Sequence, residues 1–255
     1  MPRVKRQKSH TGLYHVFVRG INKEKIFNQV REKQYFKRTI KKYLNKYDVE
    51  IHAYCIMSNH AHLIIKVDEN QKLSYFMSNV LAEYAQYYNY KHSRNGHVFQ
   101  NRFGSECIEN EKYYWNCIKY IHMNPVKAML VFAAADYKYS SFGDYRKRDN
   151  SILHENAIRN YKEKFPDWES YLIYHNMANR VIFLGMDEER YIQKKEAARI
   201  VLWEIKEEEK IQEATQIIEE PVLREKYIER IRETLKLSKA EACRLYTDIR
   251  AECPM

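Results

Sequence analysis

Two histidines two positions apart offer the first chemistry in this sequence. They lie in the stretch Ala53-Tyr-Cys-Ile-Met-Ser-Asn-His60-Ala-His62-Leu-Ile-Ile. Residues two apart in a β-strand point to the same face, so His60 and His62 can present both imidazoles to one ion. Paired imidazoles bind borderline metals, and a site completed by oxygen would also admit Mn²⁺ or Mg²⁺. The structural alternative is that both histidines are polar residues at a strand edge.

A tyrosine and an asparagine one helical turn apart form a second candidate site. In Tyr113-Tyr-Trp-Asn-Cys-Ile-Lys-Tyr120-Ile-His-Met-Asn124-Pro125, Tyr120 and Asn124 are at positions i and i+4. On a helix, a phenol and an amide oxygen would therefore share one face. The structural alternative is strong here too, because the chain has 22 tyrosines and most tyrosines pack or stack. His122 lies off the Tyr120 face and is predicted to be structural.

The elements that must position these residues alternate between strands and helices. Runs of β-branched and aromatic residues predict strands, and apolar residues at helical spacing predict helices. We predict strands over 14–19, 51–57, 62–67 and around 98–108, with helices from about Asn28 to 47, over 73–90 and over 110–123, the last stopped by Pro125. This order predicts an α+β fold, a ferredoxin-like (split βαβ) sheet with helices on one face.

The sequence after about Leu153 is helical in pattern and more acidic. One or two charged helices are expected over 188–220, and another helix is expected over 222–235 after the break at Pro221. The capping box Ser238-Lys-Ala-Glu241 should start a last helix. The last two helices could form a helix-turn-helix, although an αα-hairpin is the favoured interpretation. We therefore predict a catalytic domain over 1–150 and a helical accessory region over 151–255, with a DNA-binding or docking role.

Composition and charge narrow the class of protein. The net charge is +10, and the basic excess lies in the first 150 residues. A basic, tyrosine-rich domain suits a nucleic-acid groove, because cations contact phosphates and aromatic faces stack on unpaired bases. Solvated lysines are the alternative. The longest apolar run, 129–135, is far below the roughly 20 residues that span a membrane, so no membrane partner is expected. Five cysteines without a C-x-x-C pair favour reduced thiols in the cytoplasm.

Three segments together resemble the single-tyrosine HUH transposases, specifically the REP-associated tyrosine transposases of the IS200-like family. They are Ser58-Asn-His-Ala-His-Leu-Ile-Ile, Gly96-His-Val-Phe-Gln-Asn-Arg-Phe103 and Tyr120-Ile-His-Met-Asn-Pro-Val-Lys127, and the resemblance covers roughly residues 10–146. It implies that His60 and His62 are metal ligands, that Asn124 completes the metal shell and that Tyr120 is the nucleophile. Lys127 and Met129 stand where many relatives carry Arg and Gly.

The resemblance also implies an activity, a cofactor and a partner. The activity would be that of a DNA transposase, a single-strand endonuclease and strand transferase that acts near hairpins with Mg²⁺ or Mn²⁺. The phenol of a free tyrosine has a pKa of about 10, so it needs an activated phosphate or must lose its proton as it attacks. We expect a 5′-phosphotyrosine and a free 3′-hydroxyl, and attack by another 3′ end would rejoin DNA without ATP. The partner would be single-stranded hairpin DNA, and the protein a monomer or a homodimer.

Further side chains are candidates for DNA contacts. Phosphates could be bound by Arg19, Arg102 and Lys127, and plain surface charges are the alternative for each. Bases could stack on Phe99, Phe103 and Tyr54, although core packing is favoured for the two phenylalanines.

Rival functions remain open at the level of sequence. A ferredoxin-like sheet with exposed aromatics also holds single strands in non-catalytic RNA-recognition domains. A metal-dependent nuclease that uses water, with Tyr120 only positioning DNA, is a second rival. A domesticated relative acting on dispersed chromosomal repeats is a third interpretation.

Overall fold

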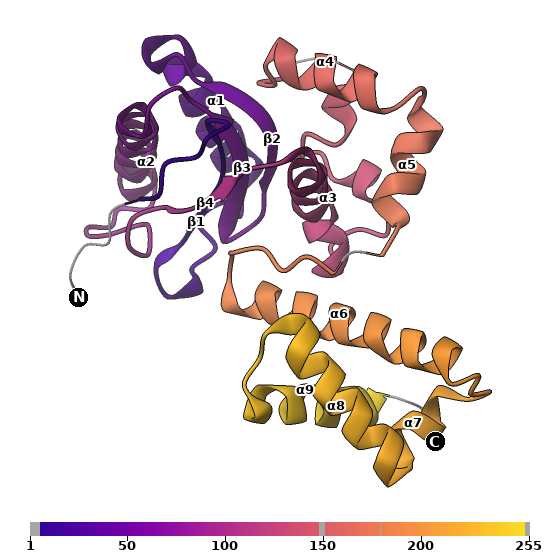
Figure 1. The fold of residues 1–255 in the computed structure, drawn as a ribbon. Coiled ribbons are helices and arrows are strands. Elements are labelled where there is room, and N and C mark those ends of the chain that lie inside the picture. The colour runs from indigo at the N-terminus through magenta and orange to yellow at the C-terminus, as the bar shows by residue number, and fades with distance from the viewer. Residues whose placement is uncertain (1–5, 148–150, 179, 253–255) are drawn as a thin grey trace. The chain divides into compact units, whose positions relative to one another are not determined.

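The computed structural model describes residues 6–147, 151–178 and 180–252. The chain divides into two compact units, residues 1–176 and residues 177–255. The first unit combines a sheet with helices, and the described residues of the second are helical or in loops (Figure 1). Among the described helices, none combines the length and the apolar character that crossing a bilayer requires.

The first unit is built on a four-stranded antiparallel sheet. Its first elements in chain order are β1 (Leu13–Arg19), η1 (Ile21–Lys23), α1 (Val30–Tyr47), β2 (Glu50–Ile56), β3 (His60–Lys66), α2 (Asn70–Lys91) and β4 (Gly104–Ile108). The strands lie in the order β2-β3-β1-β4, so β1 and β3 are central. This βαββαβ arrangement confirms the predicted ferredoxin-like α+β fold.

Successive residues of each strand point to opposite faces of this sheet. Val16 and Leu63 join the core that also contains the buried apolar residues of α1 and α2. Their strand neighbours His15 and His62 point to the other face, where their rings meet the helix α3 (Glu111–Lys127). Figure 1 shows α1 and α2 on one side of the sheet and α3 on the other. One face of the sheet is therefore an apolar core, and the other carries polar rings beneath α3.

Side chains at the helix starts fix where α1 and α3 begin. The backbone N–H of Gln29 donates to the Glu32 carboxylate at 2.7 Å, which forms a capping box. The helix therefore starts at Val30, two residues after the predicted start at about Asn28, because Glu32 can close a capping box only with Gln29. Asn110 caps α3, and its side-chain oxygen accepts from the backbone N–H of Tyr113 at 2.8 Å.

The helix α3 continues past Pro125, contrary to the prediction that it stops there. Pro125 lies in the last turn, and the helix ends at Lys127. The backbone N–H of Ala128 still donates to the Asn124 carbonyl at 3.0 Å. A proline removes only its own N–H from the helix ladder, and this loss is tolerated close to a helix end. As a result, Asn124 keeps a helical backbone and lies one turn after Tyr120.

Residues 128–147 and 151–176 complete the first unit. They form η2 (Ala134–Asp136), η3 (Gly143–Tyr145), α4 (Glu155–Lys164) and α5 (Trp168–Asn176). The backbone N–H of Ser141 donates to the Tyr54 carbonyl at 2.9 Å, and that of His154 donates to the Ile51 carbonyl at 2.8 Å. These bonds cover the outer edge of β2, whose backbone groups would otherwise lack partners. The unit boundary therefore falls after Asn176 rather than at the predicted residue 150.

The second unit is a small helical domain with its own core. Its helices are α6 (Asp187–Glu208), α7 (Ala214–Glu219), α8 (Pro221–Leu235) and α9 (Lys239–Glu252). Buried apolar residues such as Val201, Tyr227 and Leu245 join α6, α8 and α9. The predicted capping box is confirmed, because the Ser238 N–H donates to Glu241 at 3.2 Å and the Glu241 N–H donates to the Ser238 hydroxyl at 3.3 Å.

The cysteines form no disulfide among the described residues. Cys55 and Cys117 are buried, and Cys107 and Cys243 are half-buried. Cys253 lies outside the described residues. The cytoplasmic location stays a prediction.

Candidate active site

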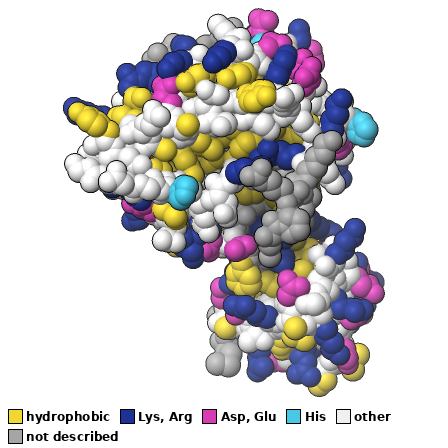
Figure 2. Space-filling view, turned by 90° about the vertical axis from the view of Figure 1, so that its left-hand side faces the viewer, with side chains coloured by type: hydrophobic (Ala, Val, Ile, Leu, Met, Phe, Trp, Pro, Cys, Tyr) yellow, Lys and Arg dark blue, Asp and Glu magenta, His cyan; other side chains and the backbone are white. Residues whose placement is uncertain are grey.

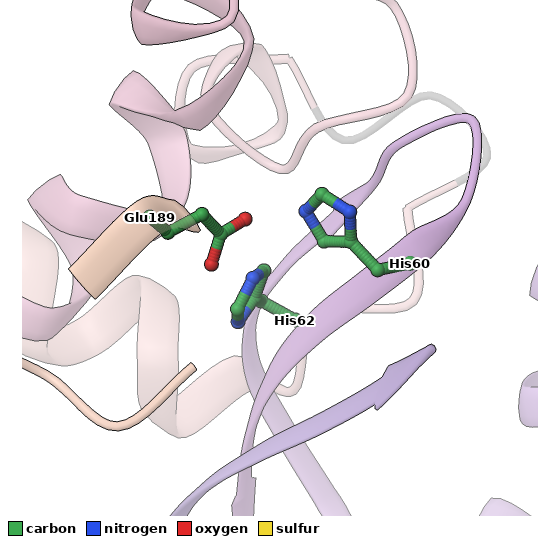
Figure 3. A group of neighbouring side chains, drawn as sticks. All are labelled: His60, His62 and Glu189. Carbon is green, nitrogen blue, oxygen red and sulfur yellow. The ribbon is translucent and has the colours of Figure 1, made fainter. Parts of the chain in front are cut away.

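His60 and His62 lie at the start of β3 and share one face of the sheet. Their side chains are nearly inaccessible, with relative exposures of 7% and 0%. The ring centroids are 5.1 Å apart at an interplanar angle of 81°, and ligand nitrogens of the two rings lie within 4.8 Å of each other. Figure 3 shows both rings projecting from β3 to the same side; Glu189, also drawn there, belongs to α6 of the second unit. The H-x-H spacing thus gives the paired imidazoles that it predicts.

Neighbouring side chains orient both rings through Nδ1. His60 Nδ1 lies 2.6 Å from Asn59 Oδ1, and His62 Nδ1 lies 3.0 Å from His15 Nε2. With Asn59 Oδ1 as the acceptor, His60 donates through Nδ1, and its Nε2 is the nitrogen left for a metal ion. Metal-binding histidines usually have their second ring nitrogen engaged in this way. The pair therefore fits a divalent cation bound through Nε2 of each ring.

Tyr120 reaches the same face of the sheet from α3. Its side chain is 4% exposed. Its ring centroid lies 5.4 Å from that of His62 at 77° and 5.7 Å from that of His15 at 85°. Both contacts are edge-to-face, a favourable geometry for aromatic rings. The fold thus brings the predicted nucleophile and a predicted metal ligand, which come from separate elements, into direct ring contact.

Asn124 lies one helical turn after Tyr120 and is 4% exposed. Its Nδ2 atom is buried and has no hydrogen-bond partner among the residues that the structure describes. A buried amide of this kind usually has a missing partner, such as a ligand, because an unsatisfied polar group is destabilising. The amide oxygen and nitrogen can exchange places by a flip. Asn124 can therefore supply the oxygen ligand that Mg²⁺ or Mn²⁺ would need beside two imidazoles.

The three predicted phosphate contacts occupy different places. Arg19 ends β1 and is paired across the strands with His60. Lys127 is the last residue of α3, three positions after Asn124. Both are half-buried and border the site. Arg102 instead is exposed in the segment before β4, where its charge faces Arg6.

The aromatic candidates for base stacking belong to the core. Tyr54 is 1% exposed, and its hydroxyl donates to Asp144 at 2.6 Å. Burial, and then the Asp144 carboxylate, raise the pKa of Tyr54. The stacking role predicted for Tyr54 was therefore wrong. Phe103 lies under the Arg6 guanidinium, with Cζ 3.7 Å from the ring centroid, and Phe99 packs against the core, as favoured from the sequence.

Three polar residues near the candidate site were not predicted from the sequence: His15, Glu106 and Tyr113. His15 is fully buried, bonds to His62 through Nε2 and has Nδ1 3.7 Å from Glu106 Oε2. Burial, followed by the Glu106 carboxylate, raises the pKa of Tyr113 on the first turn of α3. The available signal was the polar His15 in the middle of an apolar strand. Its partners could be identified only once the strand order was known.

Much of the basic excess lies on α1, away from Tyr120. Arg38, Lys41, Lys42 and Lys46 are exposed there. Figure 2 views the protein from the side of α1 and α2 and shows Lys and Arg side chains beside exposed hydrophobic ones. Because α1 and α3 cover opposite faces of the sheet, these cations do not line the candidate site. The distribution of positive charge therefore does not indicate where the candidate active site lies.

His122 belongs to a buried polar network on the outer side of α3. Its Nε2 lies 2.8 Å from Ser141 Oγ, and its Nδ1 lies 3.1 Å from both His175 Nε2 and the Tyr171 hydroxyl. Burial lowers the pKa of His122, and burial lowers that of His175 to about 4. This network links α3 to α5, so the structural role predicted for His122 is confirmed.

The first unit is expected to lose stability as the pH falls from about 6.5 to about 4. An unfolded histidine titrates at about 6.5, whereas burial, with a smaller contribution from the nearby charge of Lys119, keeps folded His175 neutral to about pH 4. In this window the unfolded chain binds more protons, so the free energy of unfolding decreases with falling pH. The full effect of this group is on the order of 3 kcal/mol.

Urea unfolding of the full chain between pH 4 and 7 measures this dependence. His175→Phe should have a shallower pH slope than the natural protein, while the exposed His10→Gln should not change it. Equal slopes for the His175 variant and the natural protein would contradict the assignment.

Comparisons with known proteins relate part of this chain to transposases. Residues 8–124 match the family described as "Transposase IS200 like". A Haemophilus influenzae protein assigned to the REP-associated tyrosine transposases is 31% identical over 117 residues, which make up 42% of this chain and 66% of that protein. The matched part is thus just under two thirds of that relative.

A solved structure shows the same fold. It is a REP-associated tyrosine transposase bound to a REP hairpin, with a TM-score of 0.50 and 22% identity, and the match covers 59% of this chain and 88% of that one. The region of the family match contains all four strands of the sheet and extends through α3 as far as Asn124. Residues 8–124 are therefore similar in sequence to the IS200-like transposases.

Proposed function

We propose that this protein is a metal-dependent single-strand DNA transesterase, a transposase that cleaves and rejoins DNA through Tyr120. The observation that carries the proposal is the edge-to-face contact of Tyr120 with His62, at 5.4 Å between centroids. Attack of a tyrosine on a phosphate needs the phenol close to the activating metal, and His62 is the predicted metal ligand beside Tyr120. The match of residues 8–124 to the IS200-like transposases supports the same chemistry.

The proposed reaction exchanges one phosphoester bond for another. The Tyr120 oxygen forms a bond to phosphorus, the bond from phosphorus to the DNA 3′ oxygen breaks, and the phenol proton leaves as the 3′ oxygen gains one. The products are a 5′-phosphotyrosine and a free 3′-hydroxyl. Because the phosphoester energy is kept in the new bond, attack by another 3′-hydroxyl rejoins DNA without ATP.

The metal would be held by His60, His62 and Asn124. When bound, a divalent cation such as Mg²⁺ or Mn²⁺ makes a phosphate more electrophilic and stabilises the charge that develops on it. The chain itself orients His60 through Asn59 and buries Tyr120 against His62.

The proposed DNA substrate is a single strand next to a hairpin. The solved relative is bound to a REP hairpin, which supports this class of substrate here. Arg19 and Lys127 border the site and are proposed to bind the phosphates on either side of the cleaved bond. A monomeric or homodimeric state stays a prediction.

Labelled hairpin DNA tests the proposal. The full chain is incubated with Mn²⁺ and a hairpin oligonucleotide that carries its label on either the 5′ or the 3′ side of the hairpin. A denaturing gel should show a protein band that retains the 3′-side label and a released fragment that carries the 5′-side label. Cleavage in which no label ever stays with the protein would favour the nuclease that uses water.

The binding-module alternative is not favoured by the sheet. RNA-recognition domains bind single strands on an exposed sheet face. Here the face opposite α1 and α2 carries the buried rings of His15 and His62 under Tyr120 of α3. Little of that face is accessible to a stacked base. Binding to many hairpins without any adduct would nevertheless revive this alternative.

The second unit is proposed to grip DNA or dock a partner. A chain that ends at Asn176 keeps every element of the first unit, so it should still form the adduct. Its hairpin affinity is expected to fall about tenfold or more, because one of two linked binding modules is lost. Fluorescence anisotropy measures the affinity. A chain that ends at residue 150 is the comparison, and it should be unstable because β2 loses the bond from His154. Unchanged affinity of the longer truncation would contradict a DNA-gripping role.

A further inference from the structure

A fully buried histidine lies in the centre of the sheet, behind the candidate metal ligands. His15 belongs to β1, which pairs with β3 on one side and β4 on the other. Its relative exposure is 0%. In the strand register it is opposite Glu106 of β4, and its side chain points to the face that carries His62 and Tyr120. A buried imidazole in this position needs polar partners on both ring nitrogens.

The contacts of His15 connect a carboxylate to the ligand pair. Its Nε2 lies 3.0 Å from His62 Nδ1, and the two rings are stacked at 5.2 Å and 19°. Its Nδ1 lies 3.7 Å from Glu106 Oε2, close enough for electrostatic attraction but longer than a normal hydrogen bond. Tyr120 meets the same ring edge-on at 5.7 Å. Glu106, His15 and His62 therefore form one row across β4, β1 and β3.

The chemistry of this row determines which nitrogen of His62 holds a hydrogen. The Glu106 carboxylate favours a hydrogen on His15 Nδ1, which leaves the lone pair of His15 on Nε2. That lone pair accepts a hydrogen bond from Nδ1 of His62. The Nε2 atom of His62 then carries the lone pair that a metal ion requires. Without His15, the His62 ring could adopt either neutral tautomer.

We propose that His15, oriented by Glu106, is a positioning residue that fixes the tautomer and the ring orientation of His62 for metal binding. The inference rests on the proposed function, because it assumes that His62 is a metal ligand. His15 itself touches neither DNA nor metal in this assignment. It acts through His62, as carboxylate and histidine partners do in other metal centres.

A second buried histidine of the same sheet provides a matched control. His52 of β2 is 2% exposed, and its Nε2 lies 3.0 Å from Glu50 Oε2. Its Nδ1 lies 2.8 Å from the Tyr114 hydroxyl of α3. His52 therefore shares burial, a carboxylate partner and a contact with α3, but its hydrogen bonds go to Glu50 and Tyr114 rather than to His62. Its replacement reports the general effect of losing a buried histidine.

Binding of Mn²⁺ to the full chain, measured by electron paramagnetic resonance without DNA, tests the proposal. His15→Phe is expected to weaken binding by about 10- to 100-fold. His15→Gln should retain more affinity, because its amide oxygen can accept from His62 Nδ1. Glu106→Gln should weaken binding in the same direction but less. His52→Phe should stay within about twofold of the natural protein.

The tautomer is measured independently of metal affinity. Long-range proton–nitrogen NMR spectra of metal-free protein distinguish a protonated ring nitrogen from one with a lone pair. The natural protein should show His62 with its hydrogen on Nδ1, and Glu106→Gln should show a mixture of tautomers. Glu106 is partly exposed, so this variant is expected to fold even if His15→Phe does not.

The outcomes separate this inference from the proposed function. Equal Mn²⁺ affinity in the natural protein, His15→Phe and Glu106→Gln would overturn the positioning role and leave the metal site intact. An equal loss in His52→Phe would also overturn it, because the effect would then come from general destabilisation. If the natural protein bound Mn²⁺ no better than His60→Ala/His62→Ala, the proposed metal centre itself would be wrong.

Discussion

Tyr120→Phe is expected to bind hairpin DNA and to form no covalent adduct with it. The substitution removes only the oxygen that would attack phosphorus. The ring can keep its contacts with His62 and His15, at 5.4 and 5.7 Å between centroids, so the fold should persist. Loss of a catalytic nucleophile reduces the rate on the order of 10³-fold or more. A denaturing gel with labelled hairpin and Mn²⁺ measures the adduct, and anisotropy measures binding.

Tyr114→Phe is the matched control for this prediction. Tyr114 lies on the same helix, is 4% exposed and has its hydroxyl 2.8 Å from His52. Its loss removes a buried hydroxyl without touching the proposed nucleophile, so the adduct should form as in the natural protein. An adduct that persists in Tyr120→Phe and disappears in Tyr114→Phe would show that the nucleophile has been misassigned.

The double variant His60→Ala/His62→Ala is expected to lose both Mn²⁺ binding and DNA cleavage. These residues supply both imidazoles of the proposed shell, and Asn124 alone is a weak ligand. The adduct rate should fall on the order of 10²-fold or more, because the phosphate loses the stabilisation of its developing charge. Removal of metal from the natural protein with a chelator should have the same effect, and added Mn²⁺ should restore activity only in the natural protein.

His52→Ala controls for the loss of a buried histidine in the same sheet. It should lower the unfolding midpoint and retain both Mn²⁺ binding and the adduct, since His52 bonds to Glu50 and Tyr114. Full cleavage in the presence of the chelator would rule out a metal-dependent mechanism. Undiminished Mn²⁺ binding by the double variant would place the ion elsewhere.

The sequence by itself determined the local geometry of the site. Strand alternation placed His60 and His62 on one face, and helical spacing placed Tyr120 and Asn124 on one face of α3. The order of strand and helix patterns predicted the ferredoxin-like fold. These features depend on residues close in the chain, whose relative positions follow from the periodicity of a strand or a helix.

The tertiary structure alone decided which of these local faces meet. The α3 helix crosses the sheet on the side opposite α1 and α2, and this crossing sets Tyr120 against His62. The strand order placed β1 between β3 and β4, and so put His15 between His62 and Glu106. Such contacts join residues far apart in the chain, and no periodicity in the sequence encodes them.

Packing also explains where the sequence interpretation went wrong. Pro125 should have ended α3, but near a helix end its missing N–H leaves only one bond unmade, so Asn124 stays helical. The boundary expected at residue 150 moved to 176 because the open edge of β2 takes its partners from Ser141 and His154. In both places the deciding factor was the hydrogen-bonding demand of backbone groups, which becomes known only when their neighbours in space are known.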